Sequence, residues 1–263
     1  MNIKSSFAYK IWDIIYPVGM YYASITIGII LAQLLFGTSN ESYMLCKIIG
    51  SCAALPVVYA DYKRDLIMTG RFGRKLKFTK AFLSHGIAAI GITICISIAL
   101  NNLILMSPLL SLSQEYQDAS DAFYGSTIGL ELLGSALITP LLEELLHRGV
   151  VYGRLRKQLS TFPAILLSAC IFAILHFNAV QFTYAFLLGL VLAVFVEKAG
   201  HIYPAVFAHI VANGIAVLRT ETGVLLNTVD GSVFAWGLSL ALLAIGVMGM
   251  VLYMKKCWKI DEE

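Results

Sequence analysis

Pro140–Gly149 reads PLLEELLHRG, and this stretch decides how the rest of the chain is interpreted. Two adjacent glutamates, a histidine and an arginine stand at the end of a long apolar run. A charged group in or near hydrocarbon costs at least about 2.5 kcal/mol, so charge in such a place indicates a functional site by default. The surrounding sequence therefore has to be tested for membrane-spanning helices.

The composition is typical of an integral membrane protein. The 263 residues are 59% hydrophobic and 13% charged, with a mean hydropathy of +0.79, whereas a soluble domain carries about 25% charged residues. Because about 20 apolar residues cross a bilayer as a helix, runs of roughly that length predict spans. We predict an all-α polytopic fold of about eight transmembrane helices, at roughly 14–36, 44–61, 81–100, 123–146, 162–179, 181–197, 203–218 and 232–254.

The placement of lysine and arginine predicts the orientation. If the N-terminus is cytoplasmic, all of the 19 basic residues except Lys47 and Arg219 lie on the cytoplasmic side. We therefore predict a protein of the cytoplasmic (cell) membrane with both termini inside. The net charge of +3 reflects this topology and not a nucleic-acid partner. The basic segment 61–80 is either a topology determinant alone or also a contact with anionic lipid headgroups.

The chain divides into three parts by the position of its chemistry. Residues 1–122 form a scaffold of three spans, 123–220 a core of four spans, and 221–263 a last span with a cytoplasmic tail, while 107–122 read as a polar outer loop. No two cysteines form a CxxC pair, so we expect neither a disulfide framework nor a soft-metal cluster. The five cysteines are Cys46, Cys52, Cys95, Cys170 and Cys257.

The two glutamates of the opening stretch are expected to differ in role. Glu144 precedes Arg148 by four residues, which is the favourable order for a helical ion pair. Glu143 points about 100° away and has no cation at that spacing, so it suits a general base beside apolar surface. Pro140 predicts a kink one turn earlier that would admit water. The alternative is that both glutamates are surface charges at the end of a helix.

Two further couplets, Phe172 with His176 and His209 with Asn213, each use a spacing of four. With a helical hairpin turning near Ser160, His176 would lie level with Glu143. His209 and Asn213 are one turn apart and can aim donors at one point. A carboxylate with such groups suits water activation and oxyanion stabilisation. The alternatives are that His176 is a core histidine bonded to a carbonyl and that HxxxN is a chance pattern.

The segments EELLHRG, FAILH and HIVAN resemble, in this order, the three motifs of the CPBP (Abi) intramembrane proteases, which include the type II CAAX prenyl endopeptidases. The resemblance covers roughly residues 123–220. It implies an intramembrane endopeptidase with a catalytic cavity, in which Glu143 and His176 activate water and His209 and Asn213 form the oxyanion hole. Glu144, Arg148 and Phe172 would be structural. His147 departs from the aromatic residue that the family commonly places before the arginine.

The resemblance implies a membrane-associated peptide or lipidated protein as substrate, with either CAAX-type or bacteriocin and leader-peptide processing. We favour a mechanism without a cofactor. The alternative is zinc held by Glu143, His176 and His209, although asparagine is a poor zinc ligand and the HExxH spacing is missing. Two other classes stay open: a non-catalytic immunity protein that binds a membrane peptide, and a proton-coupled transporter. Glu131 has no assigned role, and a pairing with Lys47 is one option.

Overall fold

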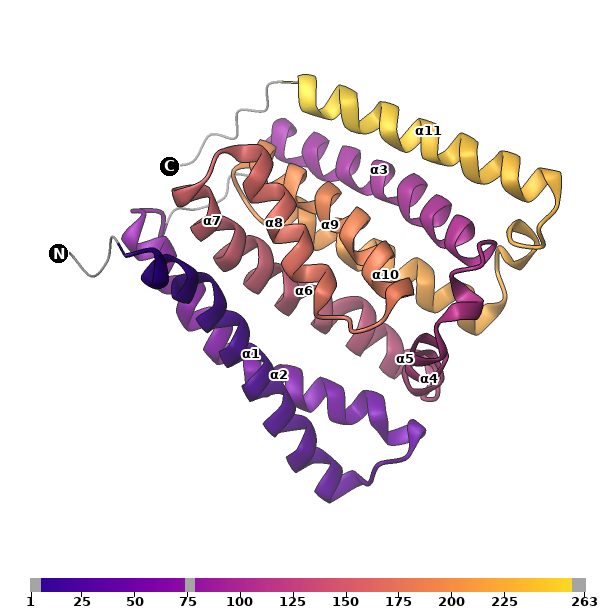
Figure 1. Ribbon diagram of the computed structural model, residues 1–263, viewed down its shortest axis with the longest axis horizontal. Helices are drawn as coiled ribbons and strands as arrows, with labels where there is room; N and C mark the ends of the chain where they lie inside the picture. Colours follow the sequence, from indigo (N-terminus) through magenta and orange to yellow (C-terminus); the bar gives the residue numbers. More distant parts are fainter. Residues whose placement is uncertain (1–5, 74–78, 257–263) are drawn as a thin grey trace.

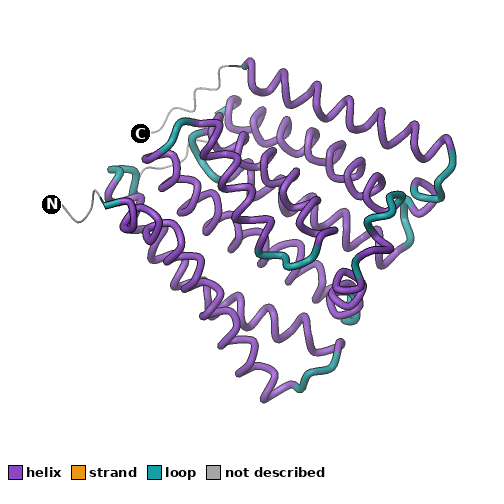
Figure 2. Tube along the Cα trace, in the orientation of Figure 1, coloured by secondary structure: helices purple, strands orange, loops and turns teal. Residues whose placement is uncertain are grey.

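The computed structural model describes residues 6–73 and 79–256, and all regular structure within these ranges is helical (Figure 2). The all-α prediction is therefore confirmed. Of the positions used above, six lie outside the described residues: Lys4, Arg74, Lys75, Lys77, Cys257 and Lys259.

The long helices coincide with the predicted apolar stretches. They are α1 (Phe7–Phe36), α2 (Asn40–Met68), α3 (Lys80–Leu105), α8 (Thr161–Ile174), α9 (Ala179–Ala199), α10 (Tyr203–Thr222) and α11 (Val233–Lys255). Among the described residues, five helices (α1, α2, α3, α9 and α11) are long and apolar enough to cross a membrane, or six spans if one bent pair is counted. A polytopic membrane fold follows, while the number eight stays a prediction.

The segment predicted as the span 123–146 is a bent and irregular helix. Its parts are α4 (Gln114–Phe123), α5 (Ile128–Glu131), η3 (Leu132–Ile138), α6 (Thr139–Glu144), η4 (Leu145–Tyr152) and α7 (Gly153–Gln158). The α4 helix meets the remainder at 110°. Both η3 and η4 are π-helical, and such wider turns are frequent at functional sites. They lie on either side of the helical turn that carries Pro140, Glu143 and Glu144.

The structure adds helical detail to one predicted connection and corrects one boundary. Residues 107–122, predicted as a polar outer loop, contain η2 (Leu110–Leu112) and α4, which gains an (i, i+4) bond from Gln114 Nε2 to Asp118 Oδ1 (3.1 Å). The predicted helix 162–179 ends at Ile174. Phe177 adopts a positive φ of 58°, and Asn178 caps α9 by accepting from the Gln181 N–H (2.8 Å), so the apolar run is split in two.

The helices pack as neighbouring pairs: α1 on α2, α3 on α10 and α11, and α8 on α9 (Figure 1). The α1–α2 hairpin is especially close, since a Cβ on Gly28 would lie 2.8 Å from the Gly50 Cα. Small residues of this kind let two helix backbones approach within a membrane. The start of α1 and the end of α11 lie at the same end of the bundle.

We call the end of the bundle that carries α7 the basic end. It also contains the C-terminal ends of α2 and α9, and its basic residues include Arg71, Arg154, Arg156, Lys157 and Lys198. Arg154 is buried there and binds Asp65 Oδ2 (2.7 Å), Asp61 Oδ1 (2.8 Å) and the Asp13 carbonyl (2.8 Å). One side chain therefore joins α7 to α1 and α2, which fixes the η4 segment against the hairpin.

Candidate active site

The adjacent glutamates at the end of α6 meet different surroundings. The Glu144 side chain is completely buried, whereas 18% of the Glu143 side chain is exposed. Neighbouring helical residues point about 100° apart, which explains the difference. Glu144 is therefore placed inside the packed helices, and Glu143 at the edge of accessible space.

Glu144 is held by two cationic or hydrogen-bonding partners. Its Oε1 accepts from Arg148 Nη1 (3.0 Å) and from His209 Nδ1 (2.9 Å). Arg148 also donates from Nη2 to the Gly189 carbonyl (3.2 Å) and lies over the Phe172 ring at 4.6 Å. The predicted Glu144–Arg148 pair is present. It joins α6, η4, α8, α9 and α10 at one point.

The structure brings Glu143 close to both predicted histidines. Glu143 Oε2 lies 3.8 Å from His209 Nε2, which is longer than a direct hydrogen bond. His176 and His209 both meet the Phe172 ring edge-on, so His176 lies in the same region. Glu143, His176 and His209 are far apart in the sequence but lie in one region of the structure. The His209 Nε2 atom is the ring nitrogen nearer the Glu143 carboxylate.

Phe172 is the packing centre of this region. Its ring meets His176 and His147 edge-on at 5.1 Å and His209 at 5.7 Å. With Arg148 over the same ring, four side chains are oriented by one aromatic surface. Phe172 is itself 3% exposed, so it has little freedom to move. Its position is consistent with the structural part expected of it.

His176 lies just beyond the last residue of α8 and not inside a helix. Its Nδ1 bonds the Phe172 carbonyl (3.0 Å), and because a carbonyl only accepts, Nδ1 carries the proton. In the neutral ring Nε2 then has a lone pair available for a water or a proton. The carbonyl bond of a core histidine and a role in water activation are compatible here, since they use different ring nitrogens.

Asn213 is anchored at the opposite side, on α10. Its Nδ2 donates to the Ser135 carbonyl (2.9 Å) in the π-helical η3 segment. An amide nitrogen carries two N–H groups, and the second has no partner among the described residues. Asn213 is therefore fixed in orientation and retains one donor.

No role was assigned to His147 and Glu131 from the sequence. In the structure, each makes a contact that stabilises the local packing or a helix end. His147 is 1% exposed, packs edge-on against Phe172 and so occupies the aromatic position with an aromatic ring. Glu131 accepts from the Ser126 N–H (3.2 Å) at the start of α5, where a helix N-terminus favours negative charge. Among the described residues no ion pair within 4.0 Å joins Glu131 to Lys47, and the Lys47 ammonium lies 3.8 Å from the centre of the Phe123 ring.

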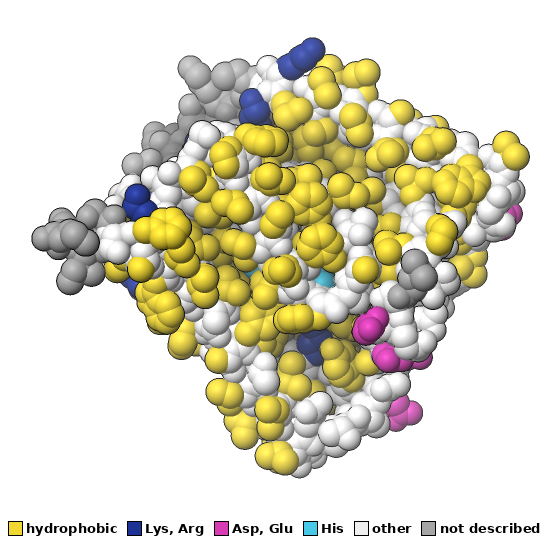
Figure 3. Space-filling view, viewed as in Figure 1, with side chains coloured by type: hydrophobic (Ala, Val, Ile, Leu, Met, Phe, Trp, Pro, Cys, Tyr) yellow, Lys and Arg dark blue, Asp and Glu magenta, His cyan; other side chains and the backbone are white. Residues whose placement is uncertain are grey.

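Lys47 is a residue of this region that the sequence did not reveal. It comes from α2 and acts electrostatically on His176, while Glu143 acts on Lys47. Figure 3 shows a largely hydrophobic face on which small areas of histidine and basic side chain lie between apolar atoms, with acidic side chains toward one edge. No motif contains Lys47, so only its unusual place within an apolar span could have indicated it.

The candidate metal ligands do not form a coordination group. Within the described part of the chain, no three His, Cys, Asp or Glu side chains are arranged so that they could hold a metal ion. Zinc ligands lie about 2.0–2.3 Å from the metal.

Comparisons with known proteins match the part of the chain that contains the three motifs. Residues 126–215 match the family model described as type II CAAX prenyl endopeptidase Rce1-like. Over 99 residues the chain is 29% identical to the protein named "Putative membrane peptidase YdiL" of Bacillus subtilis (strain 168). The aligned region covers 35% of this chain and 37% of that relative. The chain thus matches little more than a third of that relative's length. No solved structure matches the chain.

These matches confirm the resemblance to CAAX and Abi-type membrane proteases that the motifs predicted. Glu143, His176, His209 and Asn213 all lie within residues 126–215. The matched segment runs from the start of α5 into α10, and so includes both π-helical turns and the whole Glu144–Arg148–His209 arrangement.

Proposed function

We propose that this protein is an intramembrane endopeptidase that hydrolyses a peptide bond in a hydrophobic or lipidated membrane peptide. The observation that carries the proposal is the meeting of Glu143 with His209 at 3.8 Å, beside His176, within a bundle of apolar helices. The family match supports the reaction class. The substrate is of the CAAX type or a bacteriocin or leader peptide, and the protein lies in the cell membrane with both termini cytoplasmic.

In the proposed reaction Glu143 is the general base. A water bound between its carboxylate and His176 Nε2 loses a proton to Glu143 while its oxygen attacks the substrate carbonyl carbon. A tetrahedral intermediate with a negatively charged oxygen results. The carbon–nitrogen bond then breaks, and the proton held by Glu143 passes to the leaving nitrogen.

The oxyanion would be bound by His209 and Asn213. Asn213 would use the N–H that is not bonded to Ser135, so the anchoring bond also aims the catalytic donor. His209 already bonds Glu144 through Nδ1, and it must carry a second proton on Nε2 to donate to the oxyanion. Buried Glu144 supplies the countercharge for this form, while Arg148 holds Glu144 in place.

We prefer the glutamate-dependent mechanism to the zinc alternative. The chemistry of the donor set supports this preference, because Asn213 is a poor zinc ligand and the two histidines do not share one helix with the HExxH spacing. Purified protein should keep its activity with chelator and should contain far less than one zinc per chain. Stoichiometric zinc that is lost with His176→Ala would reverse the preference.

The test of the proposed function is a cleavage assay on purified protein with a library of hydrophobic peptides. Glu143→Gln should abolish cleavage without lowering the Tm, because it removes the base and keeps the shape of the side chain. Glu41→Gln, at the exposed start of α2, is the matched control and should cleave like the wild type. If Glu143→Gln cleaves normally, the assigned base is wrong. Saturable peptide binding without any cleavage would favour the immunity-protein alternative.

A further inference from the structure

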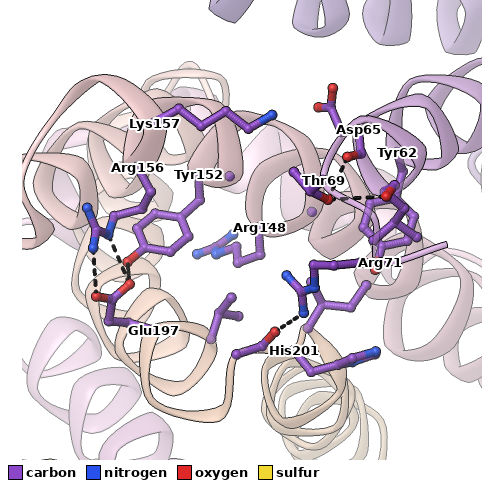
Figure 4. Close-up of a pocket in the computed structure, with 16 residues that line it drawn as sticks. Tyr62, Asp65, Thr69, Arg71, Arg148, Tyr152, Arg156, Lys157, Glu197 and His201 are labelled. Carbon is purple, nitrogen blue, oxygen red and sulfur yellow. Dashed lines mark hydrogen bonds and ion pairs between the residues drawn. The ribbon is translucent and has the colours of Figure 1, made fainter. Parts of the chain in front are cut away.

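A cavity at the basic end has none of Glu143, His176, His209 and Asn213 in its wall. It has a volume of about 350 Å³ and lies between the C-terminal end of α2, the η4–α7 segment and the C-terminal end of α9 (Figure 4). A volume of this size accommodates a small ligand. Gly153 contributes to its wall, and a Cβ built there would meet nothing within 4 Å, so the space beside Gly153 is open.

The two carboxylates that line the cavity are already bound to cations. Glu197 accepts from Arg156 Nε (3.0 Å) and from the Tyr152 hydroxyl (2.6 Å). Asp65 accepts from Arg154 Nε (2.7 Å). Neither carboxylate is therefore available to neutralise a further cation in the wall, and the cavity carries an excess of positive charge.

Lys157 and Arg71 contribute positive charge to the wall, and Arg148, which is paired with Glu144, contributes a hydrogen-bond donor. Lys157 is exposed, and no carboxylate of the described residues lies within 4.0 Å of its ammonium. Arg71 extends over the cavity from the α2 side and donates to the Gly200 carbonyl (Figure 4). Arg148 also lines the wall; its Nη1 is bound to Glu144 (3.0 Å), and its Nε has no hydrogen-bond partner among the described residues. A buried N–H of this kind is costly to leave unbonded.

We propose that this cavity binds the phosphate group of an anionic lipid headgroup. Arginine and lysine together are the usual phosphate-binding pair, the former through its planar fork and the latter as a point charge. The cavity lies at the C-terminal ends of α2 and α9, both long and apolar enough to cross a membrane, and lipid headgroups lie at the ends of such helices. Basic cavities between membrane helices on that side of a bilayer are suited to such lipids.

Binding is measured directly and does not depend on the proposed protease activity. Purified protein in detergent is titrated with dioctanoyl phosphatidylglycerol, with zwitterionic dioctanoyl phosphatidylcholine and with inorganic phosphate, and the Tm is followed. We expect phosphatidylglycerol to raise the Tm at a concentration at least tenfold lower than phosphatidylcholine. Lys157→Gln should raise the Kd for phosphatidylglycerol about fivefold, which corresponds to about 1 kcal/mol.

Two variants make the test specific to the cavity. Lys198→Gln removes the same charge from the same end, outside the cavity, and should leave the Kd within twofold of the wild type. Gly153→Leu places a side chain in the open space and should abolish the selective Tm shift while the unliganded protein stays folded.

The possible results separate the sources of the phosphate. Equal protection by the two lipids, or wild-type binding by both Lys157→Gln and Gly153→Leu, would overturn the proposal. Protection by millimolar inorganic phosphate without any effect of phosphatidylglycerol would overturn the lipid and leave a site for free phosphate. Selective protection by phosphatidylglycerol that both cavity variants weaken would support the lipid.

Discussion

At the scale of single residues, Glu144 and Arg148 form a buried pair that should contribute to stability and not directly to the reaction. Glu144→Gln keeps the shape but leaves the Arg148 charge buried without a counterion. Loss of one partner of such a pair costs about 3–5 kcal/mol, so the Tm in detergent should fall by several degrees. The double variant Glu144→Met/Arg148→Met should be more stable than either single variant, because no charge is left unpaired. An unchanged Tm for Glu144→Gln would show that the pair is not stabilising.

Asn213 should act on the transition state. Loss of one oxyanion donor costs about 10²–10³ in kcat with a modest change in KM. Asn213→Ala should therefore bind peptide and cleave it slowly, and Asn213→Asp should be slower still, because it presents negative charge to the oxyanion and to the Ser135 carbonyl.

The matched control for Asn213→Ala is Asn101→Ala. Asn101 also donates from Nδ2 to a backbone carbonyl, that of Ser97 (3.0 Å), but it lies on α3. This variant should keep the wild-type kcat. If Asn213→Ala instead raises KM at unchanged kcat, Asn213 is a substrate contact.

The sequence could predict those side-chain contacts that join two residues of the same helix. The Glu144–Arg148 pair follows from a spacing of four on a single helix. The bond from Glu144 to His209 and the approach of Lys47 from α2 depend on how separate helices pack, and no spacing along the chain encodes them. The apolar run around His176 predicts a helix there, but α8 ends at Ile174 and Phe177 adopts a positive φ. Nothing in the apolar pattern indicates this break.

At the scale of helices, the α1–α2 hairpin depends on the contact between Gly28 and Gly50. Gly28→Leu should push the two backbones apart and destabilise the protein by about 1–3 kcal/mol, as overpacking does in a dense core. Gly19→Leu is the control on the same helix, because a Cβ there meets nothing within 4 Å. The comparison is made by the Tm in detergent. An equal effect of both variants would mean that helix propensity and not the close contact is responsible.

The segment that carries Glu143 is also the least regular helix. The apolar run predicted a span there, and the hairpin turn placed near Ser160 extended it as helix, but neither could predict the π-helical turns η3 and η4. A π-turn inserts one residue without changing the apolar character of the run, so periodicity shows only a small phase shift. The Ser135 carbonyl that anchors Asn213 belongs to one of these turns, and Arg148 to the other.

At the scale of the whole molecule, the distribution of basic residues predicts the orientation in the membrane. Both termini and residues 61–80 should be cytoplasmic, because only Lys47 and Arg219 of the 19 basic residues lie elsewhere. In a variant without native cysteines, Ser160→Cys should react with an impermeant reagent only from the cytoplasmic side. Ser111→Cys should react only from the outside. Cytoplasmic labelling of Ser111→Cys would contradict the proposed orientation.

Arg148 belongs to the wall of the cavity at the basic end and also to the Glu144–His209 arrangement. A lipid bound in the cavity and a peptide bound at Glu143 would both interact with the Arg148 side chain or its partners. Their two binding equilibria are then linked in one thermodynamic cycle. The factor by which a bound lipid changes the Kd for a peptide must then equal the factor by which the peptide changes the Kd for the lipid. The amount of anionic lipid in the surrounding bilayer would in this way change the Kd for the peptide. The coupling would act through the Arg148 side chain and would need no domain movement.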